Sequence, residues 1–125
     1  MNNIEKGKLG EKIAKNFLLK NGYIFITENY YGRFGELDLI FFDNSLGNQE
    51  VVFVEVKTRS SFLYGYPEES ITHKKIEKIL LMVELFLDKN IKYKNIKWRV
   101  DGIFIIINKK CKFQKLYHYK NIIDG

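Results

Sequence analysis

The chain has 125 residues, of which 46% are hydrophobic and 15% aromatic, so we expect one folded domain over residues 1–125 and exclude a disordered chain. Its 21 lysines and arginines against 15 aspartates and glutamates give a net charge of +6, which favours an anionic partner, nucleic acid in particular. A single cysteine, no apolar signal segment and no run of ~20 apolar residues exclude an internal disulfide and a membrane span, and predict a cytoplasmic protein.

The first predicted element is a helix over residues 5–20. Apolar residues recur at helical spacing along one face of it, namely Leu9, Ile13, Ala14, Phe17 and Leu18. Asn21 and Gly22 are expected to end the helix, because both residues tolerate a left-handed backbone. A strand over residues 23–31 is expected to follow.

Residues 35–42 and 51–57 predict two further strands, since both segments are rich in β-branched and aromatic residues. The polar stretch 43–49 between them predicts that they form an antiparallel hairpin. The second strand is apolar almost without interruption, which is typical of a central strand covered on both faces.

Charged side chains give this hairpin its functional interest. If it is centred on its polar loop, Asp38 faces Glu55 and Glu36 faces Lys57. Directly opposed side chains have Cβ atoms about 4.5–5.5 Å apart, a distance at which like charges repel. A cation between Asp38 and Glu55 would remove that repulsion, so the pattern predicts a metal-dependent site.

The second half of the chain predicts another helix and two more strands. Thr72 is a suitable N-cap for a helix that reaches about Asp88. Residues 97–108 and 113–119 are expected to be strands, the second of them at an edge. The order α-β-β-β-α-β, with this extra strand, indicates an α/β fold in which a mixed β-sheet is flanked by helices. Two aromatic residues of the penultimate strand, Trp98 and Phe104, are expected in the core.

The chemistry expected at the hairpin follows from three side chains. Lys57 lies two residues after Glu55, so both leave the same face of the strand, with Asp38 opposite. Oxygen ligands of this kind suit Mg²⁺ or Mn²⁺, whereas the separated His73 and His118 offer no zinc site. A divalent ion would polarise a phosphodiester and activate water, and Lys57 would orient or deprotonate that water or stabilise the transition state.

These residues resemble a known nuclease signature. Asp38, sixteen intervening residues and then Glu55-Val56-Lys57 resemble the PD-(D/E)XK motif, with Leu37 in place of the usual proline. The chain as a whole resembles the YraN family of uncharacterised bacterial proteins, in the segments Gly10-Glu11-x-x-Ala14, Gly22-Tyr23, Gly35-Glu36-Leu37-Asp38-Leu39-Ile40, Phe53-Val54-Glu55-Val56-Lys57-x-Arg59 and Arg99-Val100-Asp101.

The resemblance implies more than the residues do by themselves. It implies a restriction endonuclease-like αβββαβ core, similar to that of Holliday-junction resolvases, and hydrolysis of DNA. It also implies that Glu11 on the first helix reaches the metal together with Asp38 and Glu55. Junction-cutting relatives generally work as dimers, so the resemblance further implies a homodimer.

Each of these residues also has a simpler interpretation. Glu11 could pair with Lys15 on a solvated helix face, although its alignment with Ala14 and Leu18 turns it towards the sheet. Glu55 and Lys57 could form an ordinary cross-strand charge lattice with Glu36.

Asp38 could lie on a solvated strand face. The apolar Ile40 and Phe42 on its own face argue against that, with Leu37 and Leu39 expected to point the other way. Glu36 itself is expected to support Lys57 or the turn, and Asp101 to anchor Arg99 or the fold.

Four cations, Arg33, Arg59, Lys74 and Lys75, are candidate phosphate contacts, because loops or helix starts place them near the hairpin end. The aromatic loop segment 62–66 could stack bases, act as a lid or simply pack.

Three functions remain open at this point. The first is a Mg²⁺-dependent nuclease acting on DNA, including branched or single-stranded intermediates. The second is a nucleic-acid-binding module of the same fold that does not cleave. The third is a scaffold that docks a protein partner through the aromatic loop.

Overall fold

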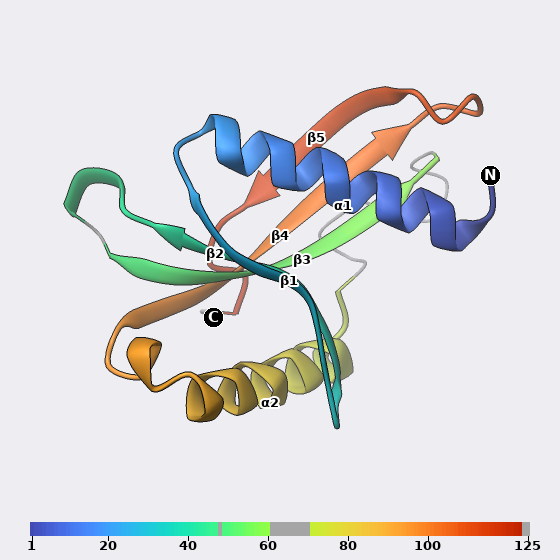
Figure 1. The fold of residues 1–125 in the computed structure, drawn as a ribbon. Coiled ribbons are helices and arrows are strands. Elements are labelled where there is room, and N and C mark those ends of the chain that lie inside the picture. Colours follow the sequence, from blue (N-terminus) through green and yellow to red (C-terminus); the bar gives the residue numbers. More distant parts are fainter. Residues whose placement is uncertain (48, 61–70, 124–125) are drawn as a thin grey trace.

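The computed structural model describes residues 1–47, 49–60 and 71–123, which form a mixed β-sheet between two helices (Figure 1). The strands lie in the order β1-β2-β3-β4-β5. The elements along the chain are α1 (Asn3–Lys20), β1 (Ile24–Gly32), β2 (Gly35–Asp43), the 3-10 turn η1 (Ser45–Gly47), β3 (Glu50–Arg59), α2 (His73–Lys89), the 3-10 turn η3 (Ile91–Tyr93), β4 (Lys97–Ile107) and β5 (Phe113–Tyr119). The predicted α/β fold with an αβββαβ core is confirmed, and β5 extends the sheet.

The sheet is mixed because one of its four pairings is parallel. Strands β1, β2 and β3 form an antiparallel meander, β4 runs parallel to β3, and β5 is antiparallel to β4. A parallel neighbour requires a crossover, and α2 supplies it between β3 and β4. The two helices cover opposite faces of the sheet (Figure 1).

Strand β3 is central, as its apolar run predicts. Val52 and Val54 pack in the core cluster that contains Ala14 and Leu18 of α1. The alternate residues of β3 belong to the second cluster, which contains Ile79, Met82, Val83 and Phe86 of α2. Both faces of this strand are therefore buried, as in parallel sheets with helices on both sides.

The predicted ends of the helices are confirmed closely. Asn2 caps α1, accepting a hydrogen bond from the Glu5 N–H while the Glu5 side chain bonds back to it. At the other end α1 stops at Lys20, followed by Asn21 as its cap and Gly22 with φ +85°. Thr72 caps α2 through the Lys75 N–H, as expected.

A buried polar network holds one end of the sheet together. The guanidinium of Arg99 lies 2.9 Å from Asp43, 3.2 Å from Glu50 and 3.0 Å from Asp101. The expectation that Asp101 anchors Arg99 is therefore confirmed. Burial alone would raise the pKa of Asp101, but hydrogen bonds from His118, Arg99 and a backbone N–H outweigh burial and lower it.

One core assignment is wrong. Trp98 is 38% exposed, whereas Phe104 is buried as expected. Lys97 and Trp98 are the first residues of β4 and are both exposed, while the rest of the strand is buried. The ring of Trp98 meets Phe53 edge-on, so one side of it is packed and the other faces solvent. In the residues the structure describes, neither helix is long and apolar enough to cross a bilayer.

Candidate functional site

The β2–β3 hairpin has the predicted register over part of its length. Its paired residues run from Asp43↔Glu50 to Leu39↔Val54. Pairing stops there, so the expected direct oppositions of Asp38 with Glu55 and of Glu36 with Lys57 do not form. Beyond Leu39, β2 remains paired only with β1. The reason is that β2 and β3 diverge after this pair of residues. Their separation leaves space beside the carboxylate of Asp38, which lines a cleft.

At the same point, the side chains of β2 change the face of the sheet on which they pack. Leu39 packs in the α1-side cluster, whereas Leu37 packs in the α2-side cluster. Strict alternation would put both on one face, so the expectation that Leu37 and Leu39 point the same way is wrong. Asn29 lies opposite Asp38 in the β1–β2 register and has φ +48°, a left-handed conformation inside a strand. Asp38 therefore lies where the hairpin twists from one face of the sheet to the other.

Asp38 lies at the point where β2 separates from β3. Its Oδ2 accepts a 2.8 Å hydrogen bond from the N–H of Val56 on β3. Burial and then the charge of Glu55 raise the pKa of Asp38 to about 8, and the bond from Val56 offsets only part of this effect. Ionisation of Asp38 is therefore costly unless a cation compensates its charge.

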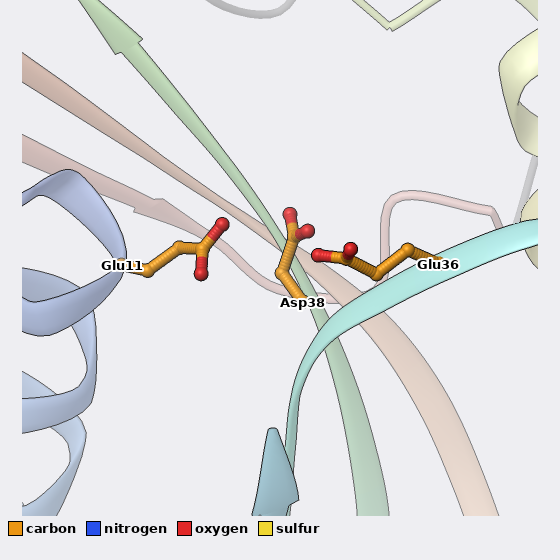
Figure 2. Close-up of side chains that lie close together, drawn as sticks. All are labelled: Glu11, Glu36 and Asp38. Carbon is orange, nitrogen blue, oxygen red and sulfur yellow. The ribbon is translucent and has the colours of Figure 1, made fainter. Parts of the chain in front are cut away.

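Glu11, Glu36 and Asp38 form what we call the acidic cluster. Each offers an oxygen within 4.8 Å of the others. Figure 2 shows Asp38 between the two glutamates, with the three side chains pointing towards one another. Burial raises the pKa of Glu11, as do Glu36 and other nearby carboxylates, against a lowering bond from Asn29.

Helix α1 delivers Glu11 to this cluster. The alternative pairing of Glu11 with Lys15 does not occur, because Lys15 forms a 2.9 Å ion pair with Glu28 of β1. Close approach of the helix depends on Gly10, where an added Cβ would lie only 1.7 Å from Thr58 Oγ1. The absence of a side chain at Gly10 therefore lets α1 lie against β3.

Glu55 and Lys57 lie next to the acidic cluster. Glu55 is 4% exposed, and its Oε1 is 3.8 Å from Lys57 Nζ and 3.3 Å from Lys75 Nζ. Glu55 is therefore held by two cations and is not among the three converging carboxylates. It still acts on them, since its charge raises the pKa of Asp38.

A cleft of about 540 Å³ brings these residues together. The four predicted catalytic residues, Glu11, Asp38, Glu55 and Lys57, all line it, whereas Glu36 lies beside its lining. Two of the predicted phosphate contacts, Arg59 and Lys75, also line it, with Lys6 of α1.

The other two predicted phosphate contacts are elsewhere. Lys74 is exposed and outside the cleft lining, and Arg33 is exposed at the β1–β2 turn, 5.7 Å from the ring of Phe34. The aromatic segment 62–66 lies outside the described residues.

The donor set suits a small, hard cation. The acidic cluster presents three carboxylates, the ligand type that Mg²⁺ and Mn²⁺ prefer. Among the residues described here, none of these three carboxylates has a lysine or arginine within ion-pair distance. A divalent ion would offset both the burial and the repulsion from other carboxylates that raise the pKa of Asp38. The residues present therefore fit a metal of this class.

Three residues of the site are not predicted from the sequence. The predicted role of Glu36, support of Lys57 or the turn, depends on an unbroken hairpin, which the structure does not have. Asn29 donates from Nδ2 to Glu11 at 2.9 Å and to Glu36 at 3.1 Å. The signal for Asn29 was weak: a turn-forming amide in the middle of an aromatic strand. Lys6 gave no signal, since charged residues at a helix start are usually only solvated.

Comparisons with known proteins agree with the overall resemblance. The sequence profile of "Uncharacterised protein family UPF0102" matches residues 10–105. A UPF0102 protein of Natranaerobius thermophilus is 44% identical over 114 residues, covering 90% of this chain and 92% of the relative. One of Persephonella marina is 42% identical over 120 residues, covering 95% and 93%. One of Clostridioides difficile is 43% identical over 90 residues, covering 72% and 75%.

Proposed function

The chain belongs to the uncharacterised protein family UPF0102, and we propose that it is a Mg²⁺- or Mn²⁺-dependent nuclease that hydrolyses phosphodiester bonds in DNA. One observation carries the proposal: carboxylates from α1 and β2 converge in a cleft that also holds Glu55 and Lys57 and has a cationic rim. The same residues carry the resemblance to the PD-(D/E)XK signature.

The acidic cluster would hold the ion, with Glu55 as a further acidic group at its side. When bound, the ion would act as a Lewis acid on the phosphodiester and lower the pKa of an attacking water. Asp38 is oriented for this task by the Val56 N–H, which fixes one of its oxygens. Lys57, 3.8 Å from Glu55, would orient the water or donate hydrogen bonds to the developing negative charge on the phosphate.

Binding of DNA would use the cations around the cleft. Lys6, Arg59 and Lys75 line it on the side of α1, at the end of β3 and at the start of α2. Contacts of this kind position the DNA backbone and do not distinguish one base sequence from another. Lys75 also pairs with Glu55, so it would link the bound phosphate to the acidic residues.

The test is cleavage of DNA by the purified protein with Mg²⁺ or Mn²⁺. Substrates should include single-stranded, duplex and branched DNA. Cleavage is expected to disappear in Asp38→Ala and Glu55→Ala, while Lys78→Ala, which changes an exposed lysine outside the cleft, leaves it intact. Activity that persists unchanged in both acidic variants would refute the mechanism.

A second candidate, a nucleic-acid-binding module that does not cleave, is favoured by the two ion pairs of Glu55. Lys75 and Lys57 both lie within 4 Å of Glu55, so this carboxylate is already compensated by the protein. Such a module would bind DNA tightly at low salt and leave it intact after long incubation.

A further inference from the structure

Asn29 of β1 contacts both glutamates of the acidic cluster. Its Nδ2 lies 2.9 Å from Glu11 Oε1 and 3.1 Å from Glu36 Oε1. Carboxylates only accept hydrogen bonds, so the amide must present its NH₂ group, whose two hydrogens provide one bond to each glutamate. Asn29 therefore links helix α1 to strand β2 through their acidic side chains.

The backbone of Asn29 aims this amide. The flanking pairs Glu28↔Leu39 and Tyr30↔Leu37 place Asn29 opposite Asp38, the central residue of the acidic cluster. Its φ of +48° is a conformation that asparagine and glycine adopt more readily than other residues. If the backbone alone required this residue, glycine would serve equally well, because it takes positive φ without steric cost. The two bonds to carboxylates are what glycine could not supply.

We propose that Asn29 is a positioning residue for the cation site: its amide bridges Glu11 and Glu36 and holds their carboxylates turned towards Asp38. This inference rests on the proposed function, because it assigns the cluster a divalent cation. The bridge engages Oε1 of each glutamate and leaves each Oε2 outside the bond. Partners that hydrogen-bond to metal ligands in this way fix the orientation of those ligands. Without the amide, Glu11 and Glu36 lose the one side chain that bonds to both of them, and the repulsion between their like charges is no longer opposed by that bridge.

The test is the Mn²⁺ affinity of the complete chain without DNA, measured from the loss of the free Mn²⁺ signal in electron paramagnetic resonance. Asn29→Gly removes the amide and keeps the left-handed backbone. We expect it to weaken Mn²⁺ binding about 10–100-fold. The matched control is Asn121→Gly, the same substitution at another asparagine of positive φ, 54°, which does not line the cleft. Its Mn²⁺ affinity should equal that of the wild type.

The outcomes separate this inference from the proposed function. If wild type and Asn29→Gly bind Mn²⁺ equally well, Asn29 serves only the backbone and the inference is wrong, while the metal site stands. If the wild type binds no Mn²⁺ or Mg²⁺ at all, the proposed function and the inference both fail. Melting temperatures in EDTA verify that Asn29→Gly is folded.

A second variant tests the bridge without metal. Asn29→Asp keeps the size of the side chain and its tolerance of positive φ, but replaces the donor with a further carboxylate facing Glu11, Glu36 and Asp38. We expect its melting temperature in EDTA to fall below that of the wild type, because both hydrogen bonds to the glutamates are lost. A melting temperature equal to that of the wild type contradicts the bridge.

Discussion

Replacing Asp38 by asparagine should stabilise the metal-free protein while abolishing its affinity for a divalent cation. The two side chains have the same shape, and the amide oxygen of asparagine can accept the hydrogen bond that Val56 N–H now gives to Asp38. What the substitution removes is a carboxyl group that burial and the charge of Glu55 make costly to ionise.

The magnitude follows from the pKa of about 8, against an ordinary value of 3.8. At pH 7 the unfolded chain ionises Asp38 while the folded chain keeps it protonated. Protonating a carboxyl of pKa 3.8 at that pH costs about 4 kcal/mol, at about 1.4 kcal/mol for each pH unit. Because the side chain is only half-buried, solvent screening reduces the expected gain to about 2–4 kcal/mol. For a domain of this size, that gain is a melting temperature higher by roughly 6–15 °C.

The pKa shift also determines how the free energy of unfolding changes with pH. Since the pKa of Asp38 is raised on folding, the folded protein binds more protons than the unfolded chain between pH 3.8 and about 8. Its stability therefore falls as the pH rises through that window. The asparagine variant lacks this contribution. Its advantage should be absent near pH 4, grow towards pH 8 and then stay constant.

The assay is urea unfolding in EDTA from about pH 5 to pH 9, with Asp43→Asn as the opposite control. Hydrogen bonds from Ser45 and Arg99 outweigh burial and lower the pKa of Asp43, so its substitution should destabilise the protein. Mn²⁺ should raise the melting temperature of the wild type and leave that of Asp38→Asn unchanged. An asparagine variant no more stable than the wild type at pH 8 would refute the reasoning.

Three further substitutions test the framework of the site. Gly10→Ala should lower the free energy of unfolding by about 1–3 kcal/mol, measured by urea titration, because its Cβ would collide with Thr58 Oγ1. Arg99→Met should cost about 3–5 kcal/mol by the same measurement, since it leaves buried carboxylates without their cation. Lys75→Gln should reduce, by about 1, the slope of the logarithm of the DNA association constant against the logarithm of the salt concentration. The control Lys78→Gln, at an exposed lysine outside the cleft lining, should leave this slope unchanged.

The fold was predictable because local signals agreed with one another. The apolar stripe of α1, the cap at Thr72 and the continuous apolar run of β3 each pointed to the same layered arrangement. The hairpin register was predictable from the position of its polar loop, and it holds from Asp43 to Leu39. These features depend on neighbours in sequence, or on simple alternation.

The geometry of the site was less predictable because alternation breaks there. Strict alternation predicts a hairpin that continues beyond Leu39 and pairs Glu36 with Lys57, whereas β2 leaves β3 and places Glu36 beside Asp38 and Glu11. The twist at Asn29 is a tertiary feature, which strand propensity does not encode. Glu11 was placed by resemblance, and its position depends on the close packing that Gly10 allows.

The sheet itself offers an internal comparison that argues for a cation from outside. Near the other end of the β2–β3 ladder, Asp43, Glu50 and Asp101 also gather three carboxylates, and there the guanidinium of Arg99 lies among them. Burial would raise the pKa values of Asp43 and Asp101, but hydrogen bonds lower both: bonds from Ser45 and then Arg99 act on Asp43, and bonds from His118 and then Arg99 act on Asp101.

In the acidic cluster, the three carboxylates form no ion pair with any described residue, and the pKa values of Glu11 and Asp38 are raised. The same domain thus contains one triad of carboxylates with a built-in cation and one without. Folding would be easier if the second triad also had an arginine or if its acids were amides. That this chain carries neither is understandable if the missing charge is a divalent ion bound from solution.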